Sequence, residues 1–124
     1  SSLGGFYATA VAQATGWPAV LLNPAVDPAR DLAAYVGELA SFHAPEEHFF
    51  FRAESIAELR QLAVPAITHP ERIFAVIAKG DEVLDWRQAA DFYAGSRQTV
   101  LPGGDHSFTR FAEFMPQILE YAGL

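Results

Sequence analysis

Two short apolar runs stand out along the chain, at residues 19–22 and 73–78, and turn-forming residues bound both of them. An apolar run without polar alternation is typical of a strand that is covered on both faces, as in a parallel sheet. Residues 98–101 form a further short strand, which ends at a Pro-Gly-Gly turn. We therefore predict three strands.

The stretches around these strands have the composition and spacing of helices, and they end at Gly, Pro or polar residues. Asp27, followed by Pro28, predicts the N-terminus of a helix that extends to about Leu39. The other predicted helices cover residues 4–15, 54–62, 85–93 and 108–121.

The last predicted helix, at residues 108–121, is amphipathic. Its apolar positions should face inward, and Pro116 within it should cause a local kink or interrupt one hydrogen bond. These apolar positions are Phe111, Phe114, Ile118 and Leu119.

Strands that alternate with helices predict an α/β fold with a parallel sheet and right-handed crossovers. The expected order is helix, strand, helical insertion, strand, helix, strand, helix within a single domain, with the insertion at about residues 27–65. In such sheets, reactive groups gather at the carboxyl ends of the strands. Those ends are Asn23-Pro24, Gly80-Asp81 and the turn from Gly103 to His106.

The composition restricts the classes of partner. Of the 124 residues, 8 are Lys or Arg and 15 are Asp or Glu, so the formal net charge is -7. We expect so acidic a chain to bind neither nucleic acid nor an anionic membrane, because phosphate groups would repel it. The absence of cysteine excludes a disulfide scaffold and a thiolate nucleophile, and it fits a reducing compartment. No apolar run approaches the roughly 20 residues that span a bilayer.

Ser2 lies two residues before Gly4, as in the second half of a Gly-x-Ser-x-Gly nucleophile elbow. Small residues beside the serine would let the chain turn sharply into a helix and expose the hydroxyl. The backbone N–H of Leu3, at the start of that helix, would then be an oxyanion donor. The pair alone is a weak signal, because a serine at this place is also an ordinary helix N-cap.

Asp81 and His106 supply the other residue types that a catalytic triad requires. Asp81 follows the strand at residues 73–78, and His106 follows the last strand in the sequence Gly-Gly-Asp-His. The order Ser, Asp, His along the chain is that of an α/β-hydrolase triad, in which the imidazole takes the serine proton and the carboxylate orients the imidazole. Asp85 is the rival acid, although it is placed to cap the next helix.

Four segments together resemble the YqiA type of small esterase within the α/β-hydrolase superfamily. They are Ser-Ser-Leu-Gly-Gly-Phe-Tyr-Ala-Thr at residues 1–9, Asn-Pro-Ala-Val at 23–26, Gly-Asp-Glu-Val-Leu-Asp at 80–85 and Gly-Gly-Asp-His-Ser-Phe at 103–108. The resemblance implies a three-layer α/β-hydrolase fold and a cytoplasmic hydrolase of acyl esters or thioesters that uses no cofactor. It also implies Ser2 as nucleophile, Asp81 as acid and His106 as base.

The resemblance also leads us to expect an incomplete sheet. Members of the family begin with further strands and a His-Gly-Phe-type turn that supplies a second oxyanion donor, and these 124 residues contain neither. We expect the sheet to lack its N-terminal strands, which would expose an apolar edge, and the missing donor to cost about 10²–10³-fold in rate. Through that edge the chain would form a homo-oligomer or bind a complementing N-terminal segment.

The insertion is rich in aromatic residues, and by analogy with α/β-hydrolases it is expected to be a cap over the acyl group. Phe42 in the insertion, with Asn23 and Pro24 at the end of the first strand, are candidates for the substrate pocket. A satellite core within the insertion is the alternative role for its aromatic residues. His43 and His48 match no helix-borne zinc motif, so we expect no metal there.

The leading hypothesis is a serine esterase or thioesterase that acts on a small acyl substrate. The alternative is a non-catalytic, hydrolase-like module that binds a partner or self-associates. A haloperoxidase or lyase would use the same triad geometry, and the sequence does not separate it from an esterase because the shape of the pocket selects the chemistry.

Overall fold

The computed structural model describes residues 1–31 and 53–124, which belong to two compact units. One unit is Ser1–Val26 with Val64–Leu124, and the other is Asp27–Ala63. In the second unit, α4 spans Ala53–Leu62 and residues 28–31 are helical. The Asp27 carboxylate accepts a hydrogen bond from Arg30 N at 3.3 Å, so the predicted N-cap is confirmed. The rest of that predicted helix lies outside the described residues.

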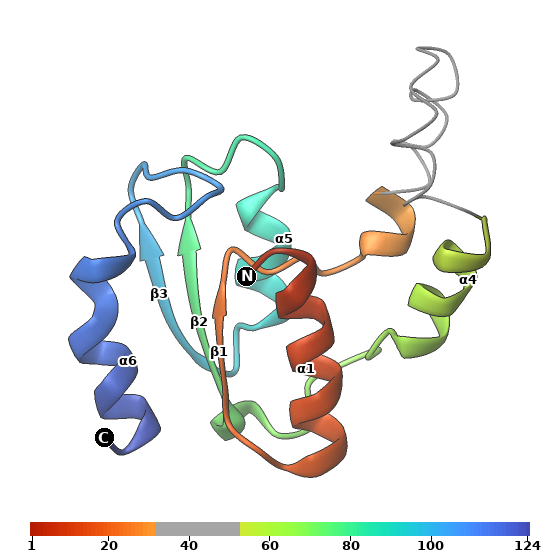
Figure 1. Ribbon diagram of the computed structural model, residues 1–124, viewed down its shortest axis with the longest axis horizontal. Coiled ribbons are helices and arrows are strands. Elements are labelled where there is room, and N and C mark those ends of the chain that lie inside the picture. The colour runs from red at the N-terminus through yellow and green to blue at the C-terminus, as the bar shows by residue number, and fades with distance from the viewer. Residues whose placement is uncertain (32–52) are drawn as a thin grey trace. The chain divides into compact units, whose positions relative to one another are not determined.

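A parallel three-stranded sheet forms the centre of the first unit, in the order β1-β2-β3 (Figure 1). The strands are β1 (Ala19–Leu22), β2 (Ile73–Ala78) and β3 (Arg97–Leu101). Leu22 pairs with Val76, and Ala78 pairs with Leu101, so the three carboxyl ends lie at one edge of the sheet. The prediction of an α/β fold with a parallel sheet is confirmed. Among the described residues, β1 has a strand on one side only.

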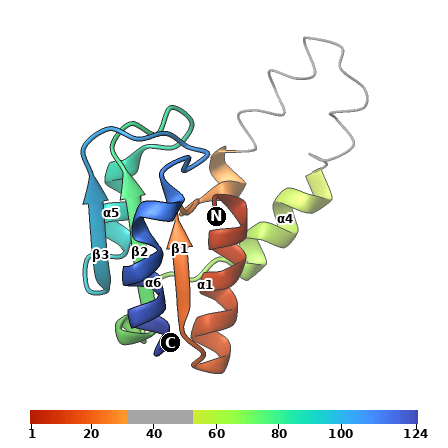
Figure 2. The same cartoon turned by 60° about the vertical axis from the view of Figure 1, so that its left-hand side comes forward.

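Helices cover both faces of this sheet (Figure 2). On one face, α1 (Leu3–Thr15) and α5 (Trp86–Phe92) pack against alternate residues of β2 that include Ile73 and Ile77. On the other face, α6 (Met115–Ala122) packs against the cluster that contains Phe74 and Val76. Side chains of a strand point alternately to the two faces, so one apolar run supplies both clusters.

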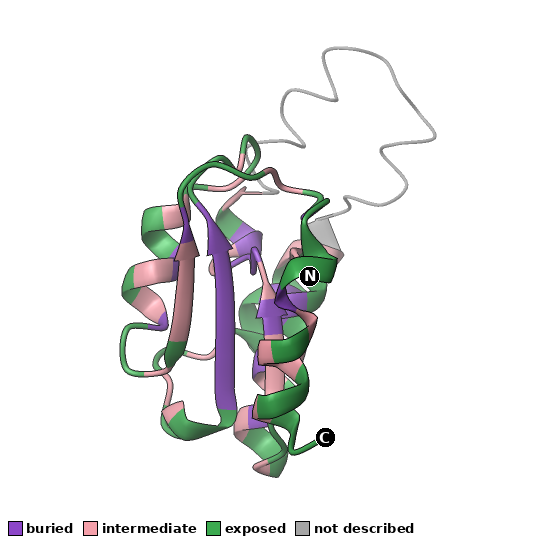
Figure 3. Cartoon of the chain, turned by 90° about the vertical axis from the view of Figure 1, so that its left-hand side faces the viewer, coloured by how far each residue is buried: buried purple, intermediate pink, exposed green. Residues whose placement is uncertain are grey.

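β2 is buried along its whole length between its two neighbours (Figure 3). Every residue of Ile73–Ala78 is buried, which explains why its sequence shows no polar alternation. Polar groups therefore begin only where the strand ends, at Lys79 and beyond.

α1 is rich in alanine and ends at Gly16, whose φ of 76° is a left-handed conformation that favours glycine. Inside the unit, the Thr9 hydroxyl donates to Gly5 O at 2.8 Å and lies 2.9 Å from the Tyr93 hydroxyl. Burial raises the pKa of Tyr93, so this phenol stays neutral at physiological pH. The contact between Thr9 and Tyr93 joins α1 to the chain just after α5.

The prediction of one continuous helix at residues 108–121 is wrong. A 3₁₀-helix covers Phe111–Phe114, and the α-helix begins only at Met115, with Pro116 in its first turn. Proline has no N–H to donate, and the first turn is where no donor is needed, so Pro116 starts the helix rather than kinking it. Consequently Phe114 is buried, whereas Phe111 and Leu119 are 41% and 38% exposed and do not face the core.

None of the helices in the two described ranges is both long enough and apolar enough to cross a membrane.

Candidate active site

Ser2 adopts a strained backbone conformation at the start of α1, with φ 50° and ψ -123°. A non-glycine residue in this region costs about 1–3 kcal/mol and persists only where the surroundings hold it. Here they do, because Ser2 N donates to Leu22 O at 3.1 Å and Ser2 O accepts from Ala25 N at 3.0 Å. The serine hydroxyl makes no capping hydrogen bond to the helix, so the ordinary N-cap role does not account for Ser2.

Gly5 allows α1 to approach the turn after β1. A Cβ atom at Gly5 would lie 2.8 Å from Pro24 Cβ and 3.0 Å from Pro24 Cα, which is closer than real carbon contacts. A Cβ at Gly4 would meet nothing within 4 Å. The close packing of the elbow therefore depends on Gly5, and the glycine that the elbow motif pointed to, Gly4, has free space around it.

This difference predicts opposite outcomes for two adjacent substitutions. Gly5→Ala should lower the free energy of unfolding by about 1–3 kcal/mol, because the added methyl group overpacks against Pro24. Gly4→Ala is the matched control and should be neutral or slightly stabilising, since alanine is the better helix former. Urea denaturation of both variants measures the difference. Equal midpoints would contradict the packing role of Gly5.

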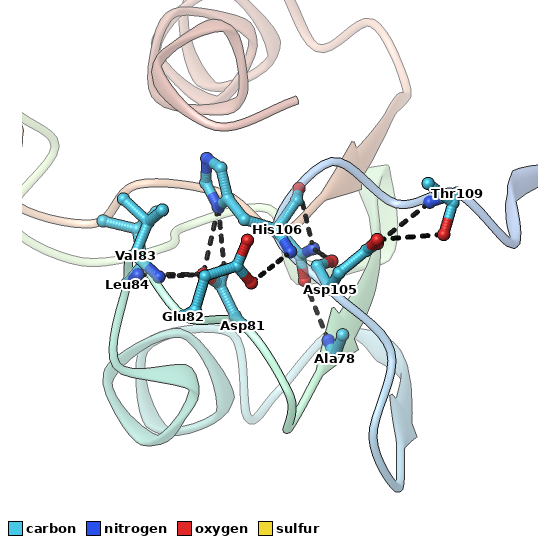
Figure 4. Close-up of polar contacts among 9 residues, drawn as sticks. Ala78, Asp81, Glu82, Val83, Leu84, Asp105, His106 and Thr109 are labelled. Atoms are coloured by element: carbon cyan, nitrogen blue, oxygen red, sulfur yellow. Dashed lines mark hydrogen bonds and ion pairs between the residues drawn. The ribbon is translucent and has the colours of Figure 1, made fainter.

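The second pair of predicted residues is in direct contact (Figure 4). The Nδ1 atom of His106 lies 3.0 Å from both Oδ1 and Oδ2 of Asp81, and the Asp81 side chain is only 3% exposed. A carboxylate can only accept, so Nδ1 must carry the proton. The other ring nitrogen, Nε2, points away from Asp81, and in the neutral imidazole with its proton on Nδ1 it has the free lone pair that a general base uses.

Backbone groups of the same loop fix the Asp81 carboxylate. Its Oδ1 atom accepts hydrogen bonds from Val83 N at 2.8 Å and from Leu84 N at 2.9 Å. Asp85, the rival acid, instead caps α5 by accepting from Arg87 N at 3.0 Å. The helix-capping role that the sequence predicted for Asp85 is confirmed.

The loops that carry Asp81 and His106 touch backbone to backbone. Gly80 N donates to Gly103 O at 2.7 Å, and a Cβ at Gly80 would collide with the carbonyl groups of Gly103 and Gly104. Gly103 and Gly104 have φ values of 87° and 79°, which only glycine adopts at little cost. Glycine at these positions therefore allows the two loops to lie together.

The acidic residue beside His106 has a structural role. Asp105 accepts hydrogen bonds from the backbone N and the hydroxyl of Thr109, at 3.0 and 2.9 Å. These bonds, the backbone bond first, lower the pKa of Asp105, so the carboxylate stays ionised and holds the turn that leads to Phe111–Phe114.

Ser2 and His106 are both attached to the turn that follows β1. Ser2 bonds to Leu22 and Ala25, as described above, and the Asn23 side-chain amide donates to His106 O at 3.2 Å. Both residues therefore lie at the carboxyl edge of the sheet. Among the described residues, no hydrogen bond joins the Ser2 hydroxyl to the imidazole; such contacts are often long without substrate and tighten when it binds.

The other candidate residues fall in different places. Leu3 begins α1, where its N–H has no carbonyl of a preceding helical turn to bond and is free to act as a donor. Pro24 is buried against Gly5, and the Asn23 side chain is buried among backbone groups; their role in the substrate pocket stays a prediction. Phe42, His43 and His48 lie outside the described residues. Within the described ranges, no cluster of three or more potential ligands is placed to hold a metal ion.

Comparison with known families gives a match over nearly the whole chain. Residues 1–123 match the model of a family described as Uncharacterised protein family (UPF0227). The matched range includes Ser2, Asp81 and His106, together with the turns that hold them.

Proposed function

The chain belongs to UPF0227, the family of YqiA-like esterases, and from this premise we propose that it is a serine hydrolase of small acyl esters or thioesters. The observation that carries the proposal is the contact between Asp81 and His106 at the same sheet edge as the strained Ser2. The parallel sheet with helices on both faces, and the chain order of these three residues, support an α/β-hydrolase fold.

The first step of the proposed mechanism forms an acyl-enzyme. Ser2 Oγ attacks the acyl carbon while His106 Nε2 removes the hydroxyl proton, and Asp81 stabilises the imidazolium that results. The tetrahedral intermediate collapses with transfer of that proton from Nε2 to the leaving alcohol or thiol. Water then attacks the acyl-enzyme with His106 again as base, which releases the carboxylic acid and restores Ser2.

The first turn of α1 would stabilise the oxyanion of that intermediate. The N–H of Leu3 is the first free donor after Ser2, and the positive end of the helix dipole adds to its effect. The proposed mechanism uses no thiol, which agrees with the cysteine-free sequence, and a cytoplasmic location is part of the proposal.

An activity-based probe tests the proposal. A fluorophosphonate should react with Ser2 of the intact protein, and peptide mass spectrometry should locate the adduct on that residue. Ser2→Ala and His106→Ala should abolish labelling. Ser1→Ala is the matched control, because the neighbouring serine lies outside the elbow position and its replacement should leave labelling intact. Labelling that survives Ser2→Ala would falsify the assignment of the nucleophile.

The same protein should hydrolyse short p-nitrophenyl esters, with the loss in Ser2→Ala parallel to the loss of labelling. The hypothesis of a non-catalytic module predicts neither labelling nor hydrolysis, so these measurements distinguish it from the esterase.

A further inference from the structure

His106 is held by three side chains, and two of them bind its backbone rather than its ring. Besides the Nδ1 contact to Asp81, the His106 N–H donates to Glu82 Oε2 at 2.9 Å (Figure 4). The His106 carbonyl accepts from Asn23 Nδ2 at 3.2 Å. The peptide groups on both sides of the His106 Cα atom are thus fixed by residues from the ends of two other strands.

Asn23 links the three strand ends through one amide. Its Oδ1 atom accepts from Ala78 N at 2.8 Å, at the end of β2, and its Nδ2 atom donates to Asp105 O at 2.8 Å as well as to His106 O. Both amide hydrogens are therefore occupied, and the residue is only 2% exposed. Its φ of 46° is a left-handed conformation that asparagine tolerates better than most residues.

Glu82 completes the arrangement from the solvent side. It is exposed, it is adjacent to Asp81 in the chain, and its carboxylate reaches across to the His106 loop. Hence Asp81 and Glu82, consecutive residues after β2, bind the ring and the backbone N–H of the same histidine.

We propose that Asn23 and Glu82 are positioning residues, which fix the backbone of His106 and thereby the direction of its Nε2 atom. The inference rests on the proposed function, in which His106 is the base. Asp81 restrains the ring only at Nδ1, and the bond from Gly80 to Gly103 holds the loop three residues before His106, so the peptide groups of His106 itself depend on further contacts. Displacement of a catalytic group by about 1 Å can cost 10²-fold in rate. Contacts that fix the backbone of the base therefore preserve the rate.

Substitutions in pairs separate positioning from simple structural support. Asn23→Gly removes the amide without strain at a positive φ. Asn23→Asp keeps an acceptor for Ala78 N but has no amide hydrogen for the Asp105 and His106 carbonyls. Glu82→Ala removes the acceptor of the His106 N–H, and Glu82→Gln retains an acceptor oxygen.

The measurement is the rate of Ser2 modification by a fluorophosphonate, resolved into the maximal rate kinact and the half-saturating concentration KI. Both Asn23 variants should lower kinact by about 10–100-fold with KI unchanged. Equal losses of kinact in Asn23→Gly and Asn23→Asp would show that the negative charge of aspartate is not the cause. Glu82→Ala should lower kinact by about tenfold or less, because water can replace an exposed acceptor, and Glu82→Gln should restore it.

Long-range ¹H–¹⁵N spectra of the His106 ring give a readout that does not depend on catalysis. In the unmodified protein the ring should show one tautomer, with the proton on Nδ1, and the Asn23 variants should show exchange broadening or a mixture.

Wild-type kinact and an unchanged ring spectrum in folded Asn23→Asp and Glu82→Ala would overturn the positioning role. If the Asn23 variants do not fold, the comparison of Glu82→Ala with Glu82→Gln decides. If the unmodified protein is not labelled, the proposed function fails, and the ring spectra still test the positioning.

Discussion

Asp81→Asn should lower kcat/KM for ester hydrolysis by about 10⁴-fold while the protein remains folded, because the amide would reverse the imidazole tautomer. Oδ1 of residue 81 is held by the backbone N–H groups of Val83 and Leu84. An asparagine would keep its oxygen at that position and turn its NH₂ group toward His106 Nδ1. Two donors cannot face each other, so the ring proton would move to Nε2, and the base could no longer accept the serine proton.

Asp85→Asn is the matched control, because it makes the same chemical change four residues away. Asparagine caps helices as well as aspartate does, so α5 should keep its hydrogen bond to Arg87 N and the protein its activity. Steady-state kinetics with a p-nitrophenyl ester and thermal unfolding of both variants measure the contrast. A large loss of activity in Asp85→Asn, together with normal activity in Asp81→Asn, would show that the catalytic acid has been assigned to the wrong carboxylate.

Gly80→Ala should reduce both stability and activity. The added Cβ at residue 80 would lie 2.7 Å from the carbonyl carbon of Gly103 and closer still to the carbonyl oxygen of Gly104. Neither backbone atom can move away unless the whole loop moves. Overpacking of this kind costs about 1–3 kcal/mol in the free energy of unfolding. Separation of the loops would also displace Asp81 from His106, so we expect a fall of about 10²-fold in kcat/KM.

Gly95→Ala provides the control for this prediction. A Cβ at Gly95 would lie 3.7 Å from Pro70 Cβ, which is an ordinary van der Waals distance. This contact includes no residue of the candidate active site. Urea denaturation together with steady-state kinetics should show a clear effect for Gly80→Ala and little for Gly95→Ala. Full activity in Gly80→Ala would mean that the two loops are not held by their close approach.

Local patterns were sufficient to predict the strands of the sheet. β1 and β2 begin and end where the sequence predicted, because an apolar run bounded by Gly, Pro or charged residues has few alternatives in a covered sheet. The start of α5 was likewise visible, since Asp85 is a strong N-cap. The last helix was predicted less well, because periodicity alone does not reveal that Pro116 favours the first turn over the interior.

The candidate site was visible from the sequence only as residue types at strand ends. Ser2, Asp81 and His106 could be identified as candidates from their order, and the contact between the last two is a matter of loop geometry. The position of Asn23 after a strand predicts only that it lies near the site, and no local pattern reveals that its amide donates to carbonyls that lie far along the chain. Glu82 carried no signal of its own, because nothing local indicates that its carboxylate reaches the His106 N–H.

The parallel order of the strands has a consequence for how the protein folds. Each member of the proposed triad is attached to a different strand end, and both strand pairings join segments that are distant in the chain. Non-local pairings form slowly, because the intervening loops must close before any contact stabilises them. We therefore expect recovery of the proposed activity during refolding to follow completion of the sheet rather than formation of its helices.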